Sequence, residues 1–227
     1  MASINSIFLS LLGGVLPALL WLWFWLKEDG LHPEPKKRIA LIFLVGMCAV
    51  LLVLPIEKYI FSLTAGISLI TIVLWAAAEE LLKYIGALVS GLKQRDMDEP
   101  IDAVIYMITA ALGFSALENA LFLFNLLDNG LFTQSIITGN SRFLGATLLH
   151  VATSAVIGVF IGFSFYKRPA YKKIFLYTGF IVSVILHTIF NLLIIKVRDE
   201  MFFVFAGVWV CLIILIVLIE KIKKVKN

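Results

Sequence analysis

Three ionisable side chains interrupt a strongly apolar stretch of the sequence, LWAAAEELLKYIGALV, and they are Glu79, Glu80 and Lys83. A charged side chain at the middle of a membrane costs roughly 2.5–3.5 kcal/mol, so such residues normally face a protein interior or a water-filled cavity. On a helix, Lys83 is spaced to reach either carboxylate. One carboxylate could then act as a general base while Lys83 holds the other ionised. The same groups could also form a proton relay.

Further polar residues lie inside later apolar stretches. They are Glu118, Asn119, His150, Ser154, His187 and Asn191. Four of these groups lie at a similar distance from one side of the membrane. Each is 14–17 residues from the nearest charged residue on the Lys/Arg-rich side of its own span, and the four are Glu79, Glu118, His150 and His187. At 1.5 Å per residue they share one layer, about 21–26 Å from that boundary. The spacing therefore predicts one shared polar site, nearer the opposite membrane face.

Seven apolar segments must position these groups. The chain has 227 residues, of which 61% are hydrophobic and only 15% are charged, whereas a soluble domain is about 25% charged. Each segment can cross a hydrocarbon core of about 30 Å as a helix. The segments are roughly 4–26, 39–57, 62–91, 101–127, 143–166, 173–196 and 201–220. The sequence predicts an all-α fold, a polytopic transmembrane helical bundle that forms one domain over 1–227, with short polar connections such as Asp128–Arg142.

The distribution of Lys and Arg predicts the orientation. Alternate connections and the C-terminal tail carry fourteen of these residues, and the opposite side carries four. Because cytoplasmic loops are enriched in Lys and Arg, we expect the N-terminus outside and the C-terminus in the cytosol. The net charge of +4 is therefore a sign of topology and not of nucleic-acid binding.

Four motifs occur in order along the chain. EELLK has the form EExxK, FSALEN has the form FxxxEN, and the later HVATS and HTIFN each begin with a membrane histidine. Together with Pro17 and the stretches WLWFWLKED and HPEPKKR, they extend to Asn191. This pattern resembles the PrsW family of bacterial intramembrane proteases, which shares a superfamily with the CAAX prenyl endopeptidases. The motif-bearing core is about 62–196, and the last span, 201–220, carries no motif and is expected to be peripheral.

The resemblance implies a function in the bacterial cell membrane. PrsW-like proteins cleave single-span anti-sigma factors near the outer membrane face, and a second protease then completes the release of an extracytoplasmic-function sigma factor. The implied partners are such a substrate and the lipid bilayer, with no nucleic acid. The predicted layer of polar residues lies toward that same face.

A carboxylate-activated water is the favoured mechanism. The candidate catalytic residues are Glu79, Glu80, Glu118, His150, His187 and Asn191, with Lys83, Asn119 and Ser154 in support. Glu79 or Glu80 would act as the base. His187 and Asn191 would donate hydrogen bonds to the oxyanion, and His150 would orient the water or protonate the leaving amine.

Two other chemistries stay open. Glu80, Glu118, His150 and His187 could supply the three protein ligands of a catalytic zinc, although no HExxH helix is present. Ser154 lies one turn from His150, but no carboxylate is placed to orient that histidine and there is no nucleophile-elbow sequence.

Two other classes of protein would also use these residues. A proton- or ion-coupled transporter could place carboxylates and histidines at one depth, but the two-fold repeat and paired broken helices of transporters are not evident. A non-catalytic membrane scaffold of the same fold is expected to have lost motif positions, and here all of them are present.

Overall fold

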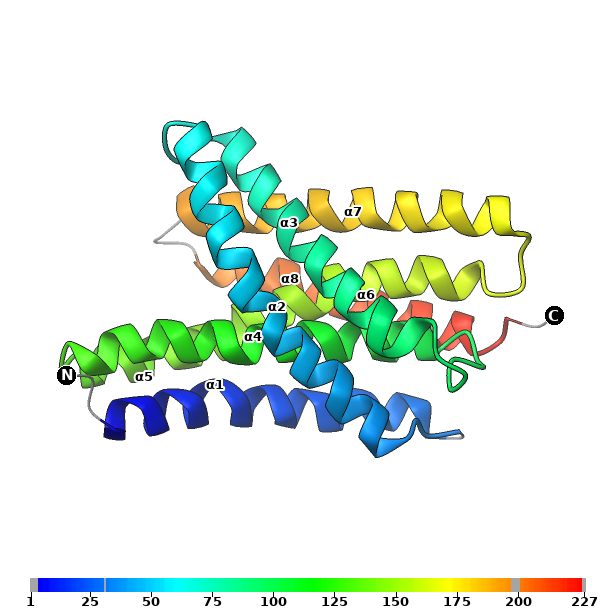
Figure 1. Ribbon diagram of the computed structural model, residues 1–227, viewed down its shortest axis with the longest axis horizontal. Coiled ribbons are helices and arrows are strands. Elements are labelled where there is room, and N and C mark those ends of the chain that lie inside the picture. Colours follow the sequence, from blue (N-terminus) through cyan, green and yellow to red (C-terminus); the bar gives the residue numbers. More distant parts are fainter. Residues whose placement is uncertain (1–3, 31, 197–200, 226–227) are drawn as a thin grey trace.

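The computed structural model describes residues 4–30, 32–196 and 201–225, and within these ranges all regular structure is helical. Figure 1 shows the arrangement of the helices. The elements are α1 (Ile4–Trp25) with the short 3-10 segment η1 (Leu26–Asp29), α2 (Lys36–Leu63), α3 (Leu69–Ala87) with the π-helical segment η2 (Leu88–Leu92), α4 (Asp102–Asp128), α5 (Phe132–Ser141), the π-helical segment η3 (Arg142–Ala146), α6 (Thr147–Phe163), α7 (Pro169–Lys196) and α8 (Met201–Ile222).

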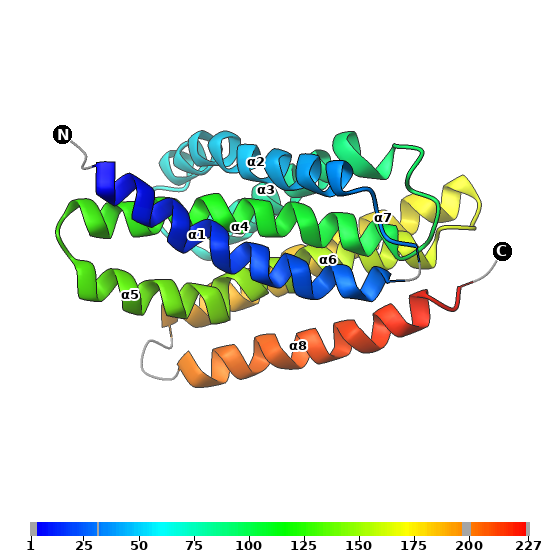
Figure 2. The ribbon, with the colours of Figure 1, turned by 90° about the horizontal axis from the view of Figure 1, so that it is seen from below.

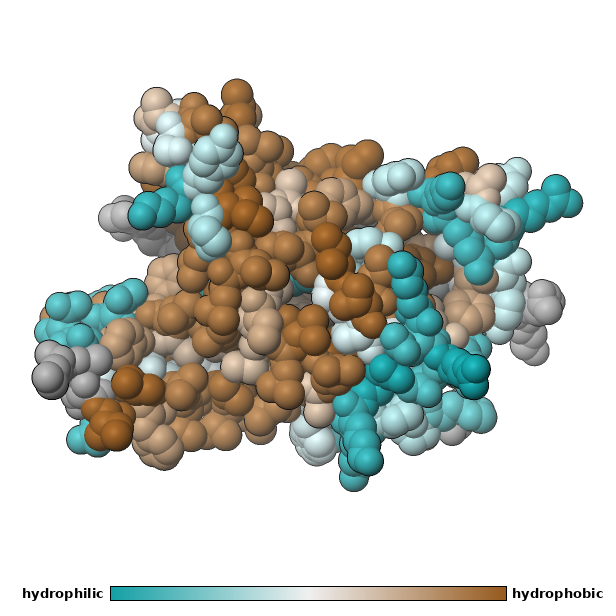
Figure 3. Space-filling model, viewed as in Figure 1, coloured by the Kyte–Doolittle hydropathy of each residue, from teal (hydrophilic) through white to brown (hydrophobic). Residues whose placement is uncertain are grey.

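Six helical stretches are long and apolar enough to cross a membrane. They are Ile4–Asp29, Lys36–Leu63, Asp102–Asp128, Phe132–Phe163, Pro169–Ile195 and Phe203–Ile222. The remaining long helix, α3, carries the charged residues Glu79, Glu80 and Lys83. In Figure 3, hydrophobic residues cover the middle of the molecule and hydrophilic residues gather toward its ends. The predicted polytopic helical bundle is therefore confirmed.

The predicted polar connection between Asp128 and Arg142 is wrong. Only residues 129–131 form a turn, and the chain then continues through α5, η3 and α6 as one helical stretch, Phe132–Phe163. The segment FTQSIITGNS is too polar and too poor in strong helix formers to be predicted as a helix. It becomes helical where it packs along α4, so tertiary contacts override its local propensity.

Two other boundaries also differ from the prediction. Helix α2 does not end at Glu57 but continues to Leu63, passing through Pro55. Helix α3 begins at Leu69, where the Ser68 side chain accepts from the Thr71 amide and the Thr71 side chain accepts from the Ser68 amide. This reciprocal capping box satisfies amides that would otherwise be left without partners at the start of a helix.

Helix α4 forms the centre of the bundle and packs against α1, α2 and α6. All its side chains from Asp102 to Ala116 are buried. Helix α2 crosses it so closely that a Cβ atom added at Gly113 would lie 2.0 Å from the Phe43 carbonyl oxygen, and one at Gly46 would lie 2.2 Å from that of Ala110. Membrane helices commonly use small residues in this way to bring their backbones together.

The outer helices surround α4 at different angles. In Figure 1, α2 and α3 cross α4 obliquely, and the turn that joins them lies away from the α4 axis. Helices α6 and α7 pack on each other, and α8 lies along α6 at the edge of the bundle, as Figure 2 shows. The first turn of α1 and the last turn of α8 lie at opposite ends of the bundle, as expected for an odd number of crossings.

Candidate active site

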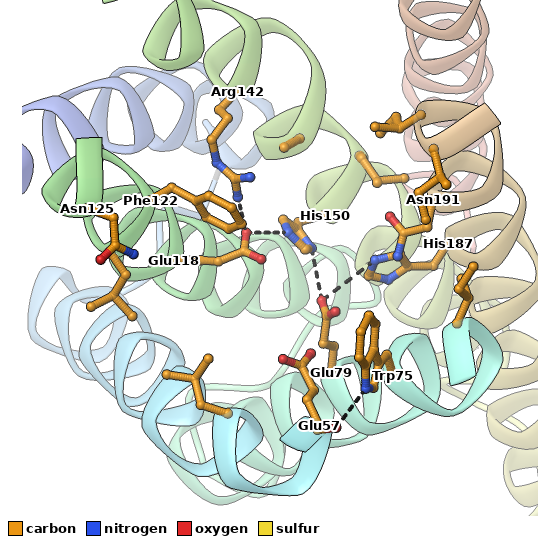
Figure 4. Close-up of a pocket in the computed structure, with 17 residues that line it drawn as sticks. Glu57, Trp75, Glu79, Glu118, Phe122, Asn125, Arg142, His150, His187 and Asn191 are labelled. Atoms are coloured by element: carbon orange, nitrogen blue, oxygen red, sulfur yellow. Dashed lines mark hydrogen bonds and ion pairs between the residues drawn. The ribbon is translucent and has the colours of Figure 1, made fainter. Parts of the chain in front are cut away.

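A cavity of about 440 Å³ lies between the α2–α3 pair and helices α4, α6 and α7. Five of the six predicted catalytic residues line it, and Figure 4 shows most of their side chains converging on one space. These five are Glu79, Glu118, His150, His187 and Asn191. They come from the middle of α3, the second half of α4, the early part of α6 and the second half of α7. The cavity therefore lies in the half of the bundle farther from the Lys/Arg-rich connections.

Glu80 is placed differently from its neighbour Glu79. Its carboxylate is fully buried and does not line the cavity. It accepts hydrogen bonds from Lys83 Nζ at 2.5 Å, His187 Nδ1 at 2.8 Å, Thr153 Oγ1 at 2.9 Å and Ser154 Oγ at 2.7 Å. With four donors around it, Glu80 joins α3 to α6 and α7, and it is not placed to activate a water molecule in the cavity. Its geometry is that of an anchor.

Glu79 has the opposite character. Its side chain is buried, yet its Oε2 atom has no hydrogen-bond partner among the described residues. This oxygen lies 3.7 Å from His150 Nδ1 and 3.6 Å from His187 Nε2, as Figure 4 shows. Both distances are too long for direct hydrogen bonds. A buried carboxylate oxygen rarely stays without a partner, so these three atoms surround a position suited to a water molecule or an ion.

The hydrogen bonds of His187 fix which of its nitrogens can act in the cavity. Because Glu80 is surrounded by donors and held ionised by Lys83, it accepts a hydrogen bond from the Nδ1–H group of His187. The neutral ring then has a lone pair on Nε2, which faces Glu79 Oε2. A carboxylate that orients a histidine through its second nitrogen is a common arrangement in hydrolytic and metal sites.

His150 is held from both sides. Lys83 Nζ, which can only donate, lies 3.1 Å from Nδ1. Nε2 therefore carries the proton and donates to Glu118 Oε2 at 3.1 Å. Glu118 is in turn paired with Arg142, whose guanidinium also donates to Asn119. This chain of contacts fixes the His150 ring in one orientation.

Arg142 and Glu57 are cavity residues that the sequence interpretation missed. Arg142 was counted as part of an outer loop, but the π-helical segment η3 directs its side chain into the cavity. Such π-helical turns occur often at functional sites. Glu57 was taken as the end of a span, but α2 continues and its carboxyl group points toward the space beside Glu79 in Figure 4. Glu57 lies about two turns before the end of α2, and a charged residue inside a helix was the sequence signal that could have indicated a cavity residue.

The two remaining predicted supporting residues hold helices together. Asn119 donates to Ser115 Oγ at 3.2 Å and to Thr147 Oγ1 at 2.9 Å, which connects α4 to α6. Ser154 donates to Glu80 and not to His150. The serine-hydrolase arrangement considered from the sequence is therefore not formed, because the hydroxyl lies behind the cavity wall with Glu80.

The metal hypothesis can be tested against the donor atoms. Glu79, His150 and His187 each place a ligand atom within 4.8 Å of the others. Ligands about 2.0–2.1 Å from a tetrahedral zinc lie about 3.3 Å apart, close to the distances from Glu79 Oε2 to the two rings. This set fits a three-ligand zinc site, although Lys83 competes for His150 Nδ1. The predicted ligands Glu80 and Glu118 lie outside the set, because each is already occupied by other partners.

Comparison with known proteins agrees with this geometry. Residues 34–219 match the family described as PrsW family intramembrane metalloprotease. The chain belongs to the PrsW family. It is 30% identical over 190 residues to Protease PrsW of Geobacillus kaustophilus, which is 80% of this chain and 78% of that protein. It is 23% identical over 218 residues to Protease PrsW of Halalkalibacterium halodurans, covering 94% and 95% of the two chains. No solved structure matches significantly.

Family membership confirms the resemblance seen in the motifs. The chain is a multi-pass bacterial membrane protein of a protease family, and its apolar helices and buried polar cavity agree with that assignment.

Proposed function

We propose that this PrsW-family protein cleaves a single-span membrane protein on the extracytoplasmic side of the bilayer, with Glu79 as the general base. The observation that carries the proposal is the buried Glu79 Oε2, which has no hydrogen-bond partner among the described residues and lies between two histidine nitrogens. The orientation predicted from Lys and Arg places this cavity nearer the outer face. An anti-sigma factor is the proposed substrate by resemblance to the family.

The reaction begins with a water molecule beside Glu79. Glu79 takes one proton while His187 Nε2 accepts the hydrogen bond from the other, which aims the water oxygen at the scissile carbonyl carbon. As the C–O bond forms, the carbonyl oxygen becomes an oxyanion. The Asn191 amide lines the same cavity and can donate to it. Glu79 then transfers the proton to the leaving amine as the C–N bond breaks.

The residues behind the cavity keep this arrangement in place. Glu80 accepts a hydrogen bond from His187 Nδ1–H, so Nε2 stays available to the water. Lys83 neutralises Glu80 and also donates to His150. The sequence left open which of the two glutamates is the base, and the geometry supports Glu79.

The lining of the cavity indicates the kind of peptide that fits. Apart from its polar centre, the cavity is walled by apolar side chains such as Ile72, Leu149 and Ile194. Toward the surface it meets Phe122, which is 49% exposed, and Asn125. An apolar substrate segment that passes from the bilayer toward water matches this change from a buried apolar wall to an exposed surface. The segment must unwind locally, because the carbonyl groups of a helix are hydrogen-bonded and shielded.

A metal at the same three atoms is the alternative mechanism. A zinc ion held by Glu79, His150 and His187 would act as a Lewis acid and lower the pKa of a bound water. Treatment with 1,10-phenanthroline, combined with metal analysis of the same sample, separates the two. Glutamate catalysis predicts full activity in metal-free protein. Loss of activity that zinc restores would assign the three residues as ligands.

The function is tested with purified protein in liposomes that contain a single-span anti-sigma factor. Mass spectrometry of the products should place the cut on the extracytoplasmic side of the substrate's span. Glu79→Gln should abolish cutting, while Glu220→Gln, a matched change at an exposed carboxylate on α8, should leave it unchanged. Cutting on the opposite side, or cutting by the Glu79 variant, would refute the proposal.

A further inference from the structure

A second cavity of about 400 Å³ lies at the other end of the bundle from the active site. It is bounded by the ends of α3, η2 and α6 and by the start of α7. Its apolar wall includes Leu88, Leu92, Ile161 and Leu176, and two lysines, Lys172 and Lys173, stand at its edge. We call this cavity the basal groove. None of these residues contributes to the proposed catalytic site.

The basal groove opens on the outer surface of the helical bundle. Its four apolar wall residues are only partly buried. On the same turns of α7, the side chains of Tyr171, Ile174 and Tyr177 are 55–65% exposed. Large apolar side chains exposed in this way on a membrane-spanning helix face lipid. The groove is therefore reachable from the bilayer, at the boundary marked by the Lys/Arg-rich connections.

The positive charge beside the groove forms no ion pair within the part of the chain that the structure describes. Lys167, Arg168, Lys172 and Lys173 fall within seven residues, and none of them forms an ion pair with a described residue. Two other cations at this end do form ion pairs, Arg38 with Asp96 and Lys223 with Glu28.

The start of α7 makes this charge less favourable still. Its first turn contains no acidic residue. Cations are unfavourable at a helix N-terminus, where the helix dipole is positive. Lys172 is also held beside the groove, with Nζ 5.6 Å from the centre of the Phe165 ring. An anion at this position would satisfy both the lysines and the helix terminus.

We propose that the basal groove binds one anionic phospholipid. The headgroup phosphate would lie against Lys172 and Lys173, and one acyl chain would lie along the apolar wall. Basic pockets between membrane helices on the cytoplasmic side are suited to such headgroups. A zwitterionic lipid brings its own cation to the headgroup and neutralises less of the local charge.

The bound lipid links the helices that supply the catalytic residues. The groove is formed by α3, α6 and α7, and these helices carry Glu79, His150 and His187 respectively. A lipid seated among their ends holds them together at the side opposite the cavity. Anionic lipid is therefore expected to raise the thermal stability of the protein.

The test compares two lysine pairs. Phosphatidylglycerol and phosphatidylcholine are titrated into detergent-purified protein, and binding is followed by native mass spectrometry and thermal unfolding. Replacing Lys172 and Lys173 by Gln should weaken phosphatidylglycerol binding about thirtyfold, from the usual contribution of a lysine near an anionic surface. Replacing Lys36 and Lys37, an exposed pair in the first turn of α2, is the matched control and should change it little.

Two further arms identify the ligand. Leu176→Trp fills the groove without changing any charge and should also reduce lipid binding, with its unfolding temperature in lipid-free detergent as the control for folding. Inorganic phosphate should neither bind nor stabilise, because it has no acyl chain. If both lysine pairs lost phosphatidylglycerol binding equally, binding would depend on general surface charge and the proposal would be wrong. Retained binding in Lys172→Gln/Lys173→Gln, or equal binding of phosphatidylcholine, would overturn the proposal.

Discussion

Glutamine substitutions at Glu79 and Glu80 should have very different effects on stability, although the two residues are adjacent. Glu80→Gln removes the charge that pairs with Lys83, leaving a buried ammonium group without its counter-ion. Breaking a buried ion pair by removing one partner costs about 3–5 kcal/mol. At about 2–4 °C per kcal/mol for a chain of this length, the unfolding temperature should fall by about 6–20 °C.

Glu79→Gln is the matched control for that experiment. Its Oε2 atom has no hydrogen bond to lose, so the change in the free energy of unfolding should stay within about 1 kcal/mol. Both variants are made in one background, and thermal unfolding is followed by intrinsic tryptophan fluorescence in the same detergent. Cleavage should be lost in both, because Glu80 also orients His187. Equal unfolding temperatures for the two variants would refute the assignment of Glu80 as a structural anchor and Glu79 as the reactive group.

Three other changes test separate parts of the structure. Ser154→Ala should keep cleavage while lowering stability by about 1–3 kcal/mol, since it loses one hydrogen bond to the Glu80 carboxylate; lost cleavage in folded protein would instead make the serine reactive. Gly113→Ala should lower the unfolding temperature, because its Cβ would overlap the Phe43 carbonyl, and an unchanged temperature would contradict the close α2–α4 packing. Reporter fusions in the 129–131 turn should give an external signal and fusions at the C-terminal tail a cytosolic one, and the reverse pattern would overturn the predicted orientation.

Much of the site was predictable because charges inside apolar helices are costly. That cost confines ionisable residues to a few positions, and counting residues from the boundaries placed Glu79, Glu118, His150 and His187 in one layer. The structure brings all four to one cavity. Their depth follows from the rise per residue, which sequence spacing fixes.

The roles of Glu79 and Glu80 could not be predicted in the same way. Adjacent helix positions point about 100° apart, and which of them faces the cavity depends on how α3 packs against α6 and α7. Three of the four partners of Glu80 lie more than seventy residues away in the sequence, at Thr153, Ser154 and His187. No local pattern shows that they surround this carboxylate.

Arg142 was missed for a related reason. Its neighbours, including Gly139 and Asn140, are typical of a loop, so the residue was placed outside the membrane span. In the structure the helix is continuous there, and η3 directs the guanidinium toward Glu118. Packing along α4 stabilises this helix, and packing between distant segments has no signature in a single sequence.

The central claim is that Glu79 activates the water that cleaves a membrane-anchored substrate. The most direct measurement is the rate of cleavage of a single-span substrate in liposomes by wild-type protein and by Glu79→Gln, each at a temperature where unfolding curves show it fully folded. Removing a general base should reduce the rate by about 10²–10⁴-fold. A folded Glu79→Gln variant that cleaves at the wild-type rate would contradict the account.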